Sequence, residues 1–142
     1  MSQIERNSQI LSKYIPSPAV NLIAHWIVDY DIKLKIKKER NTKLGDYRPP
    51  HKGLNHQITI NFNLNPYSFL VTLVHEIAHL TNWNKYQNRV DPHGTEWKAE
   101  FRRMMMPFLN EIVFPSDVLQ ALEKHMGDPA ASSCSDLRLM RT

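Results

Sequence analysis

The residues best suited to chemistry form a short run near the middle of the chain, His75-Glu76-Ile77-Ala78-His79. The two histidines are four residues apart, so on a helix they share one face and both imidazoles can reach a single ion. Glu76 is rotated by about 100° around such a helix, which removes it from direct ligation but leaves it near a metal-bound water. This H-E-x-x-H spacing is typical of an open catalytic zinc site with three protein ligands and a water molecule.

An accidental match is improbable for this composition. With seven histidines and seven glutamates in 142 residues, chance gives roughly 0.02 matches per chain. The alternative interpretation is a pair of ordinary core or solvent-facing histidines. It is disfavoured because the predicted helix already has an apolar stripe for its core contacts, made of Leu70, Leu73, Val74, Ile77 and Leu80. We therefore expect His75 and His79 on a neighbouring face of that helix.

The third metal ligand decides the subclass of the site. A third histidine six residues after the second, with a glycine between them, is excluded because Asn82 and Lys85 occupy the required glycine and histidine positions. A thermolysin-like site takes a downstream glutamate, for which Glu96 and Glu100 are the candidates. The remaining candidate is His93.

The local sequence favours His93 over the two glutamates. Gly94 allows a close approach of the backbone, and Thr95 is suited to starting a helix directly after the histidine. A cysteine ligand would have to be Cys134, the single cysteine of the chain, which lies in an aperiodic C-terminal segment. The oxyanion-stabilising residue is not identified by the sequence, and the candidates are Tyr86, Arg89, His51 and His56.

The elements that must position these residues are marked by caps and by periodicity. Asn65-Pro66 predicts the start of the metal-binding helix, which should run to about Trp83. Ser17, Thr95 and Ser116 are the predicted N-caps of three further helices, and another helix is expected over residues 3–15. Alternating apolar residues predict strands at 32–37, 44–48 and 57–64, with a turn near 41–45.

These elements predict an α+β fold in which helices pack on a small three-stranded, mainly antiparallel sheet, with the H-E-x-x-H motif on a central helix. Residues 1–127 are expected to form a single domain, and residues 128–142, which lack apolar periodicity, a loose tail. No apolar run approaches the roughly 20 residues that span a bilayer, and no secretory signal is visible. Together with the single cysteine, this predicts an intracellular, cytoplasmic protein without a membrane partner.

Lys33, Lys35 and Lys37 alternate with apolar residues and should project from one face of the first strand. Such a row usually protects a sheet edge from aggregation. The alternative is a face that binds the phosphates of DNA, which the net charge of +4 and the pI near 9.3 permit. Both interpretations stay open.

The run His75–His79, followed fourteen residues later by His93-Gly94-Thr95-Glu96-Trp97, resembles the SprT-like metalloprotease family. Its pattern is H-E-x-x-H and then, after a loop, H-G-x-x-aromatic. The lead-in Ile58-Thr59-Ile60-Asn61 before Asn65-Pro66 is also similar. The resemblance covers about residues 17–110 and is most specific in its second half.

This resemblance implies a zincin-type fold, Zn²⁺ held by His75, His79 and His93, and Glu76 as the general base. Protein or peptide substrates are implied, including DNA-bound proteins and proteins crosslinked to DNA, whose removal is a repair reaction. The strand at 57–64 would offer its edge to an extended substrate. Many members also carry a C-terminal zinc ribbon, which a chain with one cysteine does not form.

Two classes of function are compatible with these observations. The first is a zinc-dependent endopeptidase in which zinc-activated water attacks a peptide bond. The second is a non-catalytic zinc-binding module associated with DNA or transcription. The presence of Glu76 favours the endopeptidase, because a purely structural zinc site needs no base.

Overall fold

The computed structural model describes residues 1–38 and 44–129. Its strands are β1 (Ile32–Lys37), β2 (Gly45–Arg48) and β3 (His56–Asn61). Its helices are α1 (Gln3–Leu11), α2 (Ser17–Asp29), α3 (Pro66–Tyr86), α4 (Thr95–Met105) and α5 (Ser116–Met126), with a 3₁₀ turn, η1 (Met106–Phe108), after α4. The predicted α+β class with a three-stranded sheet is therefore confirmed.

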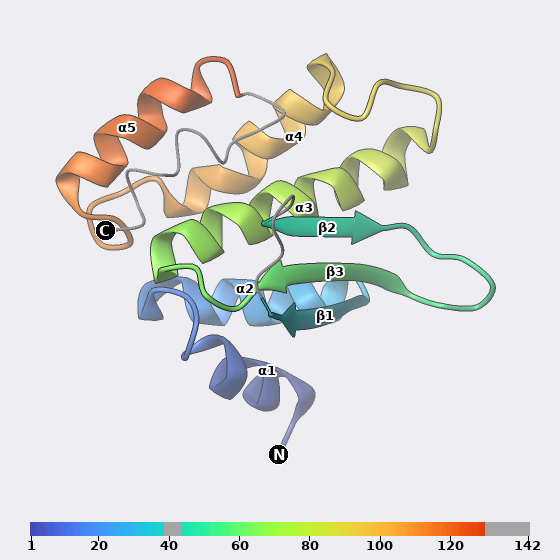
Figure 1. Cartoon of the computed structure of the whole chain (residues 1–142), viewed down its shortest axis with the longest axis horizontal. Helices are drawn as coiled ribbons and strands as arrows, with labels where there is room; N and C mark the ends of the chain where they lie inside the picture. The colour runs from blue at the N-terminus through green and yellow to red at the C-terminus, as the bar shows by residue number, and fades with distance from the viewer. Residues whose placement is uncertain (39–43, 130–142) are drawn as a thin grey trace.

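The sheet is mixed, so the prediction of a mainly antiparallel sheet is wrong. The strand order is β1-β3-β2, with β3 parallel to β1 and antiparallel to β2. The chain leaves β1, forms β2 at the opposite edge and then returns to place β3 between them (Figure 1). Apolar alternation fixes which face of a strand is buried, but it carries no information on strand order. The expected free edge on β3 is also wrong, because β3 is paired on both sides.

Helix α3 lies between the sheet and α4 (Figure 1). Every residue from Ser68 to Ala78 is buried, His75 among them. A helix covered on several sides is apolar nearly all round, which explains why the nine residues from Pro66 to Val74 carry no charge. The expectation that His75 lies beside the core stripe is thus only half correct, since its side chain is itself part of the buried interior.

The helix starts follow the predicted positions with one systematic shift. Asn65 is the N-cap of α3, and its Oδ1 accepts a hydrogen bond from the Ser68 N–H at 2.9 Å. Ser17, Thr95 and Ser116 instead lie one residue inside their helices, and the N-cap positions are Pro16, Gly94 and Pro115 without side-chain caps. Proline has φ fixed near the value needed there, and the Pro16 carbonyl accepts the N–H of Ala19.

The three lysines lie on β1, an edge strand. Lys33 and Lys37 are exposed and Lys35 is half-buried, a placement that suits protection of a sheet edge. Contact with DNA phosphates stays a prediction. Within the described ranges, no helix has the length and apolar character needed to cross a membrane. Cys134, most of the predicted tail and part of the turn near 41–45 lie outside the described residues.

The N-cap of α3 gives a first testable prediction. Asn65→Ala should lower the free energy of unfolding by about 1 kcal/mol, because the Ser68 N–H loses its acceptor at the start of the helix. Ser17→Ala is the matched control and should change stability little, since the exposed Ser17 makes no capping hydrogen bond. Urea unfolding of both variants measures the difference. Equal effects would contradict the assignment of the caps.

A candidate metal centre between α3 and the loop before α4

Three histidines from two separate segments converge at one point. His75 and His79 lie one turn apart on α3, and His93 comes from the loop that precedes α4. One ring nitrogen from each lies within 4.8 Å of the others. Among the described residues this is the group of potential ligands that could hold a metal ion, and Glu96 is not part of it.

A buried indole packs against all three imidazoles of this cluster. Trp97 is fully buried, and its ring centroid lies 4.6, 5.1 and 5.0 Å from those of His75, His79 and His93. Its Nε1–H donates a 3.4 Å hydrogen bond to the backbone carbonyl of His75. The sequence marks Trp97 only as an apolar residue and as the aromatic position of the family pattern. Its contact with all three histidines is visible only in the structure.

A tight turn orients His93. The Asp91 carboxylate accepts the His93 backbone N–H at 3.0 Å, and the Asp91 carbonyl accepts the Gly94 N–H at 3.2 Å. A Cβ at position 94 would lie 3.1 Å from the Asp91 Cβ, so glycine suits this close contact. Asp91 therefore shapes the turn that delivers the histidine.

The histidines are held in the protonation state that a metal requires. Burial lowers the pKa of His75 to about 3, with further lowering by the nearby imidazoles of His79, His93 and His125. Burial and the proximity of His93 lower the pKa of His79 to about 4. The pKa of His93 is also lowered by burial, against a smaller opposing effect of Asp91. Because a metal ion binds the neutral imidazole, these histidines need not lose a proton before binding an ion at neutral pH.

Glu76 is 7% exposed and follows His75 directly on α3. The first residue of β2, Gly45, lies against it. A Cβ at position 45 would lie 3.2 Å from Glu76 Oε2 and 2.8 Å from Thr72 Cγ2, the second of which is too close to tolerate without a shift. Only glycine thus allows β2 to approach this side of α3.

Glu100, a candidate third ligand, is engaged elsewhere. Its Oε2 accepts a 2.8 Å hydrogen bond from Lys85 Nζ and its Oε1 a 2.9 Å bond from Arg103. Burial opposes ionisation of Glu100, but the hydrogen bonds from Arg103 and Lys85 outweigh it and lower the pKa of the carboxyl group. The interaction ties α4 to the end of α3 rather than serving a metal.

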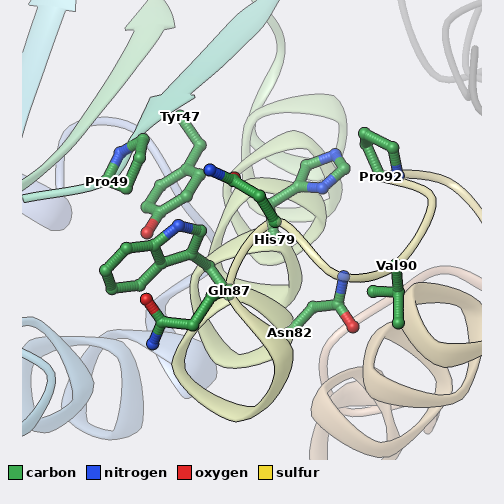
Figure 2. A pocket seen from close by; sticks show the side chains of 9 residues that line it. Tyr47, Pro49, His79, Asn82, Gln87, Val90 and Pro92 are labelled. Carbon is green, nitrogen blue, oxygen red and sulfur yellow. The ribbon is translucent and has the colours of Figure 1, made fainter.

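A cavity of about 370 Å³ opens beside His79 (Figure 2). Tyr47 and Pro49 line it from β2 and the segment after it, His79 and Trp83 from α3, and Pro92 from the loop before α4. Sequence reasoning missed Tyr47, for which periodicity offers no signal. Asn82, Gln87, Asn88 and Val90 complete the lining.

Two of the four candidate oxyanion donors, His56 and Arg89, already make hydrogen bonds within the protein. His56 Nδ1 lies 2.8 Å from the Tyr47 hydroxyl, so the two side chains share a hydrogen bond. Arg89 donates to the backbone carbonyls of Tyr86 and Lys85 at 2.9 and 3.2 Å. His51 is exposed in the loop between β2 and β3. Neither His51 nor His56 belongs to the histidine cluster.

The lowered histidine pKa values predict how the metal-free protein responds to acid. Below about pH 6.5 the unfolded chain takes up protons on its histidines, whereas His75 and His79 stay neutral in the fold down to about pH 3 and 4. The unfolded state then binds more protons, so the free energy of unfolding falls by up to roughly 1.4 kcal/mol per pH unit for each group. The free energy of unfolding is therefore highest above pH 6.5 and decreases toward pH 4.

Urea unfolding of metal-free protein at several pH values between 4 and 7 measures this slope. His79→Gln removes one of these titrating groups and should make the slope shallower. A slope that this substitution leaves unchanged would contradict the role of the buried histidines.

Searches of curated proteins and of solved structures gave no significant match. The model of the SprT-like family matches residues 20–119, which include β1, β2 and β3, the histidine cluster and Trp97. The chain, in which two segments of this matched region bring three histidines onto one buried indole, therefore belongs to the SprT-like family.

Proposed function

We propose that the protein is a zinc-dependent endopeptidase of the SprT-like type. The observation that carries the proposal is the set of three neutral histidines within 4.8 Å of one another, with Glu76 beside the first of them. Three nitrogen ligands and an adjacent carboxylate match the donor set of an open catalytic zinc site. The residues present therefore fit the metal that the family implies, in a zincin-type arrangement.

His75, His79 and His93 would hold the ion, which when bound supplies a water of lowered pKa and polarises a substrate carbonyl. Glu76 accepts the proton of the attacking water and passes it to the nitrogen of the departing amine. Its buried position against Gly45 limits the directions in which the carboxylate can turn. Contacts with the Trp97 ring fix the orientation of the His75 and His79 imidazoles. These side chains therefore need little rearrangement when a substrate binds.

An extended substrate is best accommodated along β2. Because β3 is the central strand, the edge of the sheet nearest the cavity belongs to β2, whose Tyr47 lines that cavity together with His79. A peptide that adds to a sheet edge gains main-chain hydrogen bonds irrespective of its sequence. Pairing along β2 would end at Arg48, since Pro49 has no N–H to donate.

The competing proposal is a non-catalytic zinc-binding module associated with DNA or transcription. It needs the histidines but gives Glu76 no task. The exposed lysines of β1 are the feature that supports a DNA partner, and DNA-bound or DNA-crosslinked proteins as substrates stay a prediction. Activity measured with and without single-stranded DNA separates these cases.

The assignment of the three histidines as ligands predicts that replacing any one of them weakens zinc binding. His75→Ala, His79→Ala and His93→Ala should each weaken zinc binding by at least about 10- to 100-fold, the loss typical even of residues that only support a ligand. Glu96→Ala is the matched control and should retain the metal, because Glu96 lies outside the cluster. Metal analysis after dialysis against a weak chelator measures the content. An emptied site in the glutamate variant would instead indicate a thermolysin-like ligand set.

The proposed base predicts a loss of activity without a loss of metal. Glu76→Gln keeps the shape of the side chain but removes the proton acceptor, so casein cleavage should fall by about 10²- to 10⁴-fold. Zinc content should equal that of the unmodified protein. Undiminished cleavage would assign the activity to another base or a contaminant. A zinc-loaded protein that cleaves nothing, with or without single-stranded DNA, would support the non-catalytic module.

A further inference from the structure

The segment that joins α3 to α4 starts with a backbone conformation that glutamine rarely adopts. Gln87 follows the last residue of α3 and has φ 57° and ψ −133°. These angles lie close to those of the second residue of a type II′ turn, about 60° and −120°, where glycine predominates because it has no Cβ. The Arg89 N–H donates to the Tyr86 carbonyl at 3.1 Å and closes this turn. The turn is therefore strained, and such a conformation persists only where the surrounding structure holds it.

The Arg89 side chain supplies contacts that hold the turn. Its Nε donates a 2.9 Å hydrogen bond to the Tyr86 carbonyl, and its Nη2 donates a 3.2 Å bond to the Lys85 carbonyl. Both carbonyls belong to the last turn of α3, where helical N–H partners are missing and a positive charge is favourable. The Lys85 side chain is paired with the buried Glu100 of α4 at 2.8 Å. Arg89 thus attaches the start of the loop to an end of α3 that is itself fixed against α4.

This loop leads directly to the proposed third metal ligand. His93 lies four residues beyond the turn, and the loop passes beside His79, where it lines the cavity with Val90 and Pro92 (Figure 2). The Asp91 turn orients His93 within the loop, but its two hydrogen bonds do not reach α3. The direction in which the loop leaves α3 is instead set by the strained turn.

We propose that Arg89 is a positioning residue for the metal centre, because its guanidinium holds the strained turn at Gln87 and so places His93 relative to the two histidines of α3. The inference rests on the proposed function for the identity of the metal, but metal affinity is measured independently of cleavage. Without the guanidinium, Gln87 relaxes and the loop leaves α3 in another direction. His93 must then be brought back into place when an ion binds, which weakens binding. His75 and His79 keep their spacing, since the helix alone sets it.

The affinity for Zn²⁺, measured by competition with a chromophoric chelator, tests this placement. Arg89→Met keeps the length of the side chain but removes its donors, so zinc affinity should fall by about tenfold, as is typical for residues that orient a ligand. Arg102→Met is the matched control. Arg102 is also exposed and donates in the same way to two carbonyls at the end of α5, those of Met126 and Gly127, at 2.8 and 3.0 Å. This variant should bind zinc as tightly as the unmodified protein.

A double-mutant cycle separates positioning from a general loss of stability. In a His93→Ala background, Arg89→Met should change zinc affinity by less than about twofold, because the ligand through which Arg89 acts is gone. In the Arg89→Met background, Gln87→Gly should restore part of the lost affinity, since glycine adopts the turn conformation without strain.

Equal zinc affinities of Arg89→Met and the unmodified protein would overturn the positioning role, and so would a loss of the same size in the His93→Ala background. Failure of Gln87→Gly to restore affinity would overturn the part assigned to the strained turn. Zinc binding that depends on Arg89 in a protein that never cleaves casein would overturn the proposed endopeptidase and leave the role of Arg89 intact. An unmodified protein that binds no zinc would overturn both.

Discussion

The packing of one buried indole against three imidazoles holds the candidate site together. Trp97 touches His75 and His79 from α3 and His93 from the loop before its own helix, so a single side chain connects the two segments that carry the potential ligands. Aromatic contacts of this kind are directional as well as apolar, which gives each ring a defined orientation. One turn further along α4, the ion pair of Glu100 with Lys85 joins the same two helices again. The position of His93 therefore depends on the interface between α3 and α4 and not on its own loop alone.

The opposite side of the site depends on a close backbone approach. Gly45 opens β2 directly against Thr72 and Glu76, where any larger residue would force these side chains or the strand to move. This approach places β2 near the carboxylate and, two residues later, Tyr47 in the lining of the cavity. The carboxylate thus lies between a helix and a strand, while the histidines lie between two helices. A change in either interface would alter the position of Glu76 relative to the three histidines.

Keeping three neutral imidazoles close together inside the protein has a thermodynamic consequence. Burial prevents His75 and His79 from charging over most of the acidic range, so the cluster favours binding of a cation other than the proton. Because an ion that binds the folded state alone stabilises it by mass action, a metal ion bound at this cluster would couple its binding to folding. Of the three histidines, His75 is the one whose side chain is buried.

The sequence by itself determined the candidate site residues and most of the local structure around them. The spacing of His75, Glu76 and His79, the cap at Asn65 and the apolar alternation of the strands are local properties, because each depends on residues a few positions apart. Only the tertiary structure decided that β3 lies between β1 and β2, that Trp97 supports all three histidines, and that Glu100 pairs with Lys85 instead of facing the cluster. These outcomes depend on contacts between segments far apart in the chain, where several pairings satisfy the same apolar pattern. The choice among them is made by close packing, which periodicity does not encode.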